Sequence, residues 1–158
     1  MTQKFDGSEM VELAIQIEIN GRDFYNALYE KSKNEKAKKV FAHLADEEEK
    51  HIARFKGILG SLKKYEPKEA YPDEYFAYMN SMASEQVFTK KDKGREVAEK
   101  TKNETEAIDL GIGFEKESIG FYEGMKKIVP KGDIKILDDL LAEEQRHLEQ
   151  LIHLRGGM

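Results

Sequence analysis

The run LADEEEKH at residues 44–51 places two ionisable side chains inside an apolar helical stripe. Alternating steps of three and four residues through this region give Phe41, Leu44, Glu48, His51, Phe55, Ile58 and Leu62. Such spacing is typical of an α-helix with one buried face. The stripe therefore predicts a core helix on which Glu48 and His51, three residues apart, point to the same side.

A second run of the same kind lies near the end of the sequence. The run LLAEEQRH at residues 140–147 matches residues 44–51 at a shift of 96 positions, so that Glu48 falls on Glu144 and His51 on His147. Here too the Glu and the His interrupt an apolar stripe. The sequence therefore contains two Glu-x-x-His helices in matching register.

Each of these two helices is preceded by a helix that also repeats. The run AIQIEINGRDFY at residues 14–25 matches GIGFEKESIGFY at residues 111–122, which places Glu18 on Glu115 and Tyr25 on Tyr122. Both Glu residues lie on apolar stripes with helical spacing. The chain is thus predicted to consist of two similar helix pairs, and every helix presents one carboxylate to the common core.

Helix start and stop signals predict four long helices, at about residues 8–31, 34–64, 103–128 and 133–155. Asn103, with Glu106 three residues on, forms a capping box that begins the third helix. Residues 65–100 contain two of the three prolines and show poor periodicity, which predicts a crossover with one short helix near residues 73–82. We expect a single all-α domain over residues 1–158, an antiparallel four-helix bundle with one long crossover between helices 2 and 3.

Composition narrows the classes of function. The chain has 39% hydrophobic and 36% charged residues, a net charge of -5 and alternating Lys and Glu, which argues against nucleic acid as a partner. It contains no cysteine, so a cysteine-ligated iron–sulfur centre is excluded and redox electrons would come from a separate donor. No segment approaches the length of a membrane span or a signal core, which predicts a cytoplasmic protein.

Four carboxylates gathered in an apolar core carry a large electrostatic cost. They repel one another and lose hydration, a cost of several kcal/mol per ion unless cations compensate it. Two divalent cations balance four Glu side chains and leave two His neutral. The sequence therefore predicts a two-metal site with the ligands Glu18, Glu48, His51, Glu115, Glu144 and His147. The alternative is that these residues are ordinary surface charges on stripes of a different phase.

Oxygen and imidazole ligands without sulfur favour iron, with manganese and zinc as alternatives. Tyr25 and Tyr122 lie seven residues beyond a predicted ligand on the same helix face. They are expected either to donate hydrogen bonds to ligand carboxylates or only to pack in the core. Gly21 and Ser118 are small residues at matching stripe positions, where they would leave room for an oxidant.

Other ionisable residues near these stripes are predicted to have no role at the site. Glu47 and Glu143 precede the predicted ligands by one residue, which turns them to another side of the helix as solvated charges. His43 and His153 lie off the stripes and are expected to be exposed.

Four runs of this sequence resemble the rubrerythrin branch of the ferritin-like superfamily: AIQIEINGRDFY, DEEEKHIARF, GIGFEKESIGFY and LAEEQRHLEQL. The resemblance covers all four long helices and leaves residues 65–100 outside it. It implies a ferritin-like di-iron protein, usually a homodimer, that reduces hydrogen peroxide or dioxygen in the response to oxidative stress. It also implies that the four Glu residues bind or bridge the irons, with His51 and His147 as terminal ligands.

Two departures from that family matter for function. Rubrerythrins have a further Glu one turn after the third-helix ligand, where this chain has Ser118. They also carry a rubredoxin-like domain with cysteine ligands, which the present sequence lacks. An external donor, such as a rubredoxin-type protein, would then supply the electrons.

Three functions are compatible with this sequence. The leading hypothesis is a di-iron oxidoreductase of the peroxidase type, and the alternative is a ferroxidase that stores or delivers iron. The third is a structural bundle with a vestigial site or a zinc site. Oligomer size would separate storage from the first hypothesis, because a storage shell needs many subunits, and metal analysis would separate the third.

Overall fold

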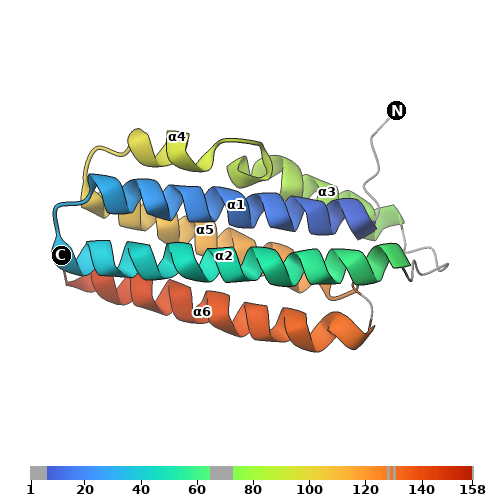
Figure 1. Cartoon of the computed structure of the whole chain (residues 1–158). Coiled ribbons are helices and arrows are strands. Elements are labelled where there is room, and N and C mark those ends of the chain that lie inside the picture. The colour runs from blue at the N-terminus through green and yellow to red at the C-terminus, as the bar shows by residue number, and fades with distance from the viewer. Residues whose placement is uncertain (1–6, 65–72, 128, 130, 158) are drawn as a thin grey trace.

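The computed structural model describes residues 7–64, 73–127, 129 and 131–157, and within these residues it contains six α-helices, two 3-10 helices and no strand. Four helices form a bundle: α1 (Gly7–Lys31), α2 (Glu35–Lys64), α5 (Glu104–Met125) and α6 (Ile134–Gly156). Figure 1 shows α1 and α2 as one antiparallel pair and α5 and α6 as the other. The predicted all-α bundle with one long crossover is confirmed.

Side-chain caps begin two of the four bundle helices. Asn103 accepts a hydrogen bond from the backbone N–H of Glu106 and so begins α5. Asn34 does the same for α2 through the N–H of Ala37, at 3.1 Å. Helix α5 ends at Met125, short of the predicted residue 128, which lies outside the described residues. The 3-10 helix η2 (Lys131–Asp133) then leads into α6.

The crossover holds more helix than the sequence predicts. The predicted short helix near residues 73–82 is present as α3 (Asp73–Glu85). It is followed by the 3-10 helix η1 (Val87–Thr89) and by α4 (Gly94–Glu99), which the sequence does not predict. These elements run along α1 on the side away from α6, and they return the chain to the end of the bundle where α5 begins (Figure 1). The first part of the predicted crossover, residues 65–72, lies outside the described residues.

One buried residue of α1, Asn20, binds four backbone groups of the crossover. Its Nδ2 donates to the carbonyl oxygens of Phe88 and Lys90, both at 2.6 Å, and its Oδ1 accepts from the N–H groups of Lys93 and Gly94, both at 3.1 Å. Gly94 is required here, because a Cβ at this position would lie 2.0 Å from the carbonyl oxygen of Asn20. The backbone of α4 therefore lies directly against α1.

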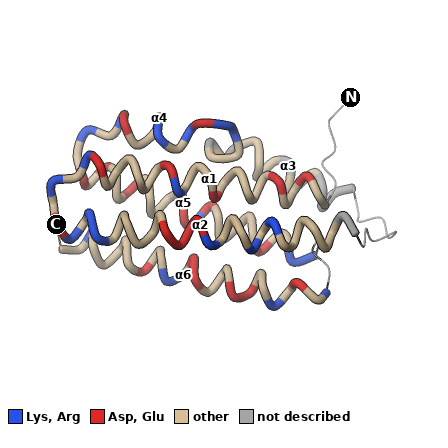
Figure 2. The backbone as a smooth tube through the Cα atoms, in the orientation of Figure 1, with Lys and Arg blue, Asp and Glu red and all other residues tan. Residues whose placement is uncertain are grey.

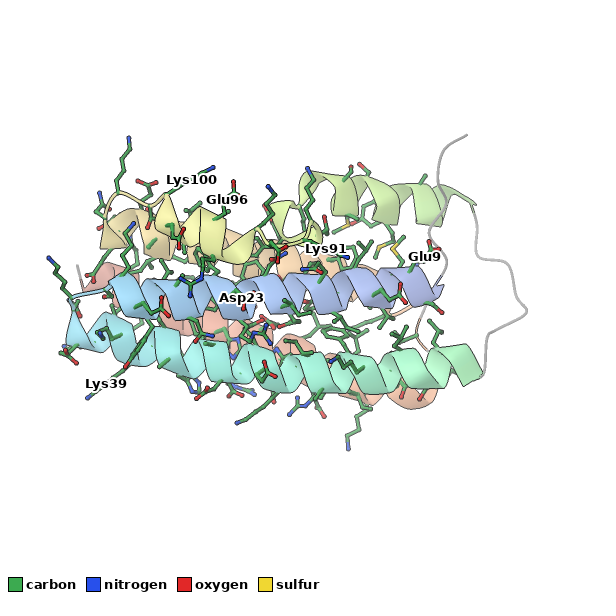
Figure 3. All side chains as sticks on the ribbon, turned by 45° about the horizontal axis from the view of Figure 1, so that its top comes forward. Glu9, Asp23, Lys39, Lys91, Glu96 and Lys100 are labelled. Atoms are coloured by element: carbon green, nitrogen blue, oxygen red, sulfur yellow. The ribbon has the colours of Figure 1, made fainter. Side chains whose placement is uncertain are left out.

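The bundle interior follows the apolar stripes of the sequence. All seven positions of the stripe from Phe41 to Leu62 on α2 are buried, and so are the predicted ligands on the other three bundle helices. Side chains fill the space between the ribbons of α1 and α2, whereas the labelled Lys39 and Lys100 extend outward (Figure 3). Charges of both signs are spread over all the long helices (Figure 2). No helix in the described part of the chain combines the length and apolar character needed to cross a membrane.

Candidate metal centre

The six predicted ligands meet at the middle of the bundle. Helix α1 contributes Glu18 and α5 contributes Glu115, while α2 contributes Glu48 and His51 and α6 contributes Glu144 and His147. Five of these residues have no exposed surface, and His147 is 2% exposed. The stripes therefore have the predicted phase, and the alternative of ordinary surface charges is wrong.

The ligand atoms divide into two groups of four. One group contains Glu18, Glu48, His51 and Glu144; the other contains Glu48, Glu115, Glu144 and His147. Within each group, the candidate donor atoms lie within 4.8 Å of one another. Glu48 and Glu144 belong to both groups, so each of these two carboxylates would serve both metal positions.

The donor atoms of these groups lack hydrogen-bond partners. Ten buried side-chain N and O atoms in the described residues have none, and eight of the ten belong to the six predicted ligands. The Nδ1 of His51 lies 2.7 Å from Glu144 Oε1, yet this short approach lacks the direction of a hydrogen bond. Unpaired buried polar atoms are costly, and one cation within each group would give these eight atoms partners. The residues present therefore fit a pair of metal ions.

Without cations, the cluster has strongly shifted protonation equilibria. Burial, followed by the negative charge of Glu144, raises the pKa of Glu48 and Glu115 well above the ordinary range. In Glu144 and His51, burial also disfavours the charged form, but neighbouring side chains outweigh the effect of burial. Neighbouring Glu115, His147 and His51 outweigh it and hold the pKa of Glu144 well below its usual range. Burial alone would lower the pKa of His51, but Glu18 and Glu144 raise it to about 11.

Two tyrosines hold the carboxylates from across the bundle. Tyr25 on α1 donates a hydrogen bond of 2.7 Å to Glu115 Oε1 on α5, and Tyr122 on α5 donates one of 2.6 Å to Glu18 Oε1 on α1. Both rings are fully buried and also pack on aromatic neighbours. The two bonds are reciprocal, and each leaves the second oxygen of its Glu without a hydrogen-bond partner.

Glu143 is not the solvated charge that the sequence predicts. Its Oε2 lies 2.7 Å from His51 Nε2 and accepts a hydrogen bond of 2.8 Å from Arg54. The prediction is wrong because Glu143, one residue before Glu144, turns toward α2 rather than toward solvent. A carboxylate on the outer nitrogen fixes the orientation of an imidazole whose other nitrogen faces a metal site. The sequence does not distinguish it, since Glu143 repeats Glu47 at the shift of 96, yet Glu47 lies beside His43.

The space beside Gly21 is occupied by an aromatic ring, so the prediction that it admits an oxidant is also wrong. A Cβ on Gly21 would lie 2.7 Å from Phe114 Cζ and 3.2 Å from Glu48 Oε2. Phe114 in turn packs on Phe88 of the crossover, with ring centroids 4.7 Å apart. Ser118, its counterpart on α5, donates a hydrogen bond to the Phe114 carbonyl. The absence of a side chain on Gly21 thus makes room for the ring of Phe114 beside Glu48.

His43 and His153 are exposed, as predicted. His43 nevertheless approaches His147 with its ring edge-on, at a centroid separation of 6.3 Å. Glu47, predicted to be solvated, has a side chain 23% exposed beside His43.

Comparison with known proteins gives a family and a fold. A family model described as rubrerythrin matches residues 9–154. A solved structure described as a ferritin-like diiron-carboxylate protein from Thermotoga maritima is 23% identical, with a TM-score of 0.66 over 98% of this chain and 97% of that one. No curated protein matches the sequence.

Proposed function

Because this chain belongs to the rubrerythrin family, we propose that it is a di-iron oxidoreductase that reduces hydrogen peroxide or dioxygen with electrons from a separate donor. The observation that carries the proposal is the pair of ligand groups that share Glu48 and Glu144. Two adjacent ferrous ions supply two electrons together, which matches the two-electron reduction of a peroxide.

The proposed ligands divide between the two iron positions. Glu18 and His51 would hold one ion, Glu115 and His147 the other, and Glu48 and Glu144 would bind both. Four carboxylates balance the charge of two divalent ions, so the buried centre is neutral while both imidazoles are uncharged. Iron in place of manganese or zinc is part of the proposal, since the donor types suit all three.

The surrounding side chains orient the ligands and exclude water. Tyr25 and Tyr122 each hold one carboxylate oxygen, which restricts the Glu side chains to the cluster. Glu143 and Arg54 fix the ring of His51. The fully buried setting strengthens electrostatic interactions at the centre and would limit the contact of bound ferrous iron with bulk water.

The electron donor is proposed to be another protein, of the rubredoxin type, because the sequence has no cysteine for an iron–sulfur centre of its own. We further propose a homodimer that works in the cytoplasm against oxidative stress. Size-exclusion chromatography with light scattering tests the dimer, and a shell of many subunits would contradict it.

The test of the reaction is stopped-flow absorbance on protein loaded anaerobically with iron. Faster oxidation by peroxide than by dioxygen, at two irons per chain, supports the peroxidase. A preference for dioxygen with turnover of excess ferrous ion supports the second candidate, a ferroxidase that handles iron. That candidate is favoured by one observation. Ser118 stands where rubrerythrins have a further Glu, and it donates its hydrogen bond to the Phe114 carbonyl, so this position gives the centre no carboxylate. No rate advantage over free ferrous iron would contradict both.

A further inference from the structure

A second cluster of metal-binding side chains lies on the outer side of the centre. It consists of His43, Glu47 and His147, whose donor atoms lie within 4.8 Å of one another. His43 and Glu47 are one turn apart on α2, with Nε2 and Oε1 separated by 3.7 Å. The exposed fraction of the three side chains falls from 49% to 23% to 3%, so the cluster leads from solvent toward the core.

His147 connects this outer cluster to the centre. Its Nδ1 faces inward, 3.5 Å from Glu48 and 3.7 Å from Glu144, which leaves Nε2 for the outer cluster. We propose that His43, Glu47 and Nε2 of His147 form an outer site that captures a divalent transition-metal ion and passes it to the core. This inference rests on the two-metal centre of the proposed function. Two imidazoles and one carboxylate, with water in the remaining positions, suit ferrous, cobalt or zinc ions.

The positions equivalent to this outer cluster in the other helix pair do not form a free cation site. At a shift of 96, Glu143 stands for Glu47, and Asp139 stands for His43. Glu143 is already held by His51 Nε2 at 2.7 Å and by Arg54 at 2.8 Å. The permanent positive charge of an arginine repels an incoming cation. Entry is therefore expected at His147 and not at His51.

Lys50 is the competing cation on the open side. Its Nζ lies 3.6 Å from Glu47 Oε2, but its side chain is 68% exposed. Ion pairs this exposed contribute little, so a divalent ion can displace the lysine.

The shared imidazole makes the outer site a transit position. A neutral imidazole offers one nitrogen to a metal while its other nitrogen carries the proton. Once Nδ1 of His147 binds an ion in the core, Nε2 becomes an N–H group and the outer site loses its third ligand. A captured ion thus occupies the outer site most strongly while the core position beside His147 is empty.

The experiment measures the rate of zinc uptake by the full-length, metal-free chain. Zinc is mixed with protein in a stopped-flow instrument, with a fluorescent chelator reporting free Zn²⁺, and bound zinc is then counted after desalting. The variants are His43→Ala and Glu47→Gln, and the matched control is His153→Ala, an exposed histidine of α6 outside the cluster. Circular dichroism verifies that each variant retains its helices.

We expect uptake by both variants to slow by about tenfold or more, because a ligand-lined entrance raises the local concentration of cations. His153→Ala should load at the wild-type rate, and all chains should finish with two zinc ions. Lys50→Gln should load faster than the wild type, since it removes the competing charge. Unchanged rates in His43→Ala and Glu47→Gln, with two ions bound, would overturn the outer site alone. Fewer than two ions in the wild type would instead overturn the two-metal centre, and the outer site with it.

Discussion

Glu144 is the residue on which both ligand groups depend most, since it belongs to both and each of its oxygens lies near one of the two histidines. We predict that Glu144→Ala lowers bound metal from two ions per chain to fewer than one, because each position loses an oxygen and the charge balance is lost. Metal analysis after desalting measures this. Glu149→Ala, an exposed residue of the same helix, is the control and should retain two ions. Two ions bound by Glu144→Ala would contradict the proposed ligands.

The tyrosine hydrogen bonds should affect metal affinity without affecting the fold. Tyr122→Phe removes the 2.6 Å bond to Glu18 but keeps the ring that packs on Phe55 at 4.9 Å. Affinity for the metal pair is expected to fall by about 10–100-fold, measured by competition with a chelator. Tyr29→Phe changes an exposed tyrosine and should leave affinity unchanged. Equal affinities for Tyr122→Phe and wild type would mean that the ring alone matters.

At the scale of residues, the ligands that interrupt an apolar stripe can be predicted from the sequence. A carboxylate on a buried helix face is costly unless a cation compensates its charge. Glu143 cannot be predicted in this way, because it lies beside the stripe. Its contact with His51 depends on how closely α6 approaches α2. Asn20 cannot be predicted in this way either. A single Asn within a helix gives no sign that four backbone groups of a distant segment will bind it.

At the scale of elements, the crossover depends on α1 for its position. We predict that Asn20→Ala destabilises the protein by about 2–4 kcal/mol, because it leaves backbone groups of residues 88–94 without partners. Amide hydrogen exchange should accelerate in η1 and α4 while α5 and α6 remain protected. Asn26→Ala, an exposed residue of the same helix, serves as the control. Uniform acceleration in all helices would show that Asn20 supports the whole bundle rather than the crossover.

The same dependence explains why the crossover is the least predictable element. The long helices can be predicted because their apolar spacing continues over four or more turns. Their caps, such as Asn103, bind backbone groups only a few residues away in the sequence. Helix α4 spans only the six residues Gly94–Glu99, too few for a period to emerge. Its position comes from Asn20 and from the fit of Gly94 against α1, and both are tertiary contacts.

At the scale of the whole molecule, the metal-free protein should lose stability as pH rises. Burial raises the pKa of Glu18, Glu48 and Glu115 above 4.5, so the folded chain holds protons that the unfolded chain releases. His51, with its pKa raised from 6.5 to about 11, acts in the same direction at higher pH. Stability therefore falls as pH increases above about 5. Glu144, whose pKa is lowered, contributes fully throughout this range.

Thermal unfolding checks this prediction. The Tm of metal-free protein should decrease between about pH 5.5 and pH 8, whereas bound metal replaces the protons and should remove or reverse that decrease. Removal of metal with a chelator at pH 8 should then lower Tm more than the same treatment at pH 5.5. A metal-free Tm that rises over this range would contradict the pKa shifts of the buried carboxyls.

The reciprocal bonds of Tyr25 and Tyr122 across the two hairpins have a consequence for how the protein could be divided. Each hairpin brings one Glu, one Glu-x-x-His pair and one tyrosine, and neither ligand group is complete without a carboxylate from the other hairpin. Two separately expressed fragments, one with α1 and α2 and the other with α3 to α6, should thus bind metal tightly only when mixed. Metal would then act as a dimerising agent, and the halves would behave as a split protein whose reassembly reports the presence of the ion.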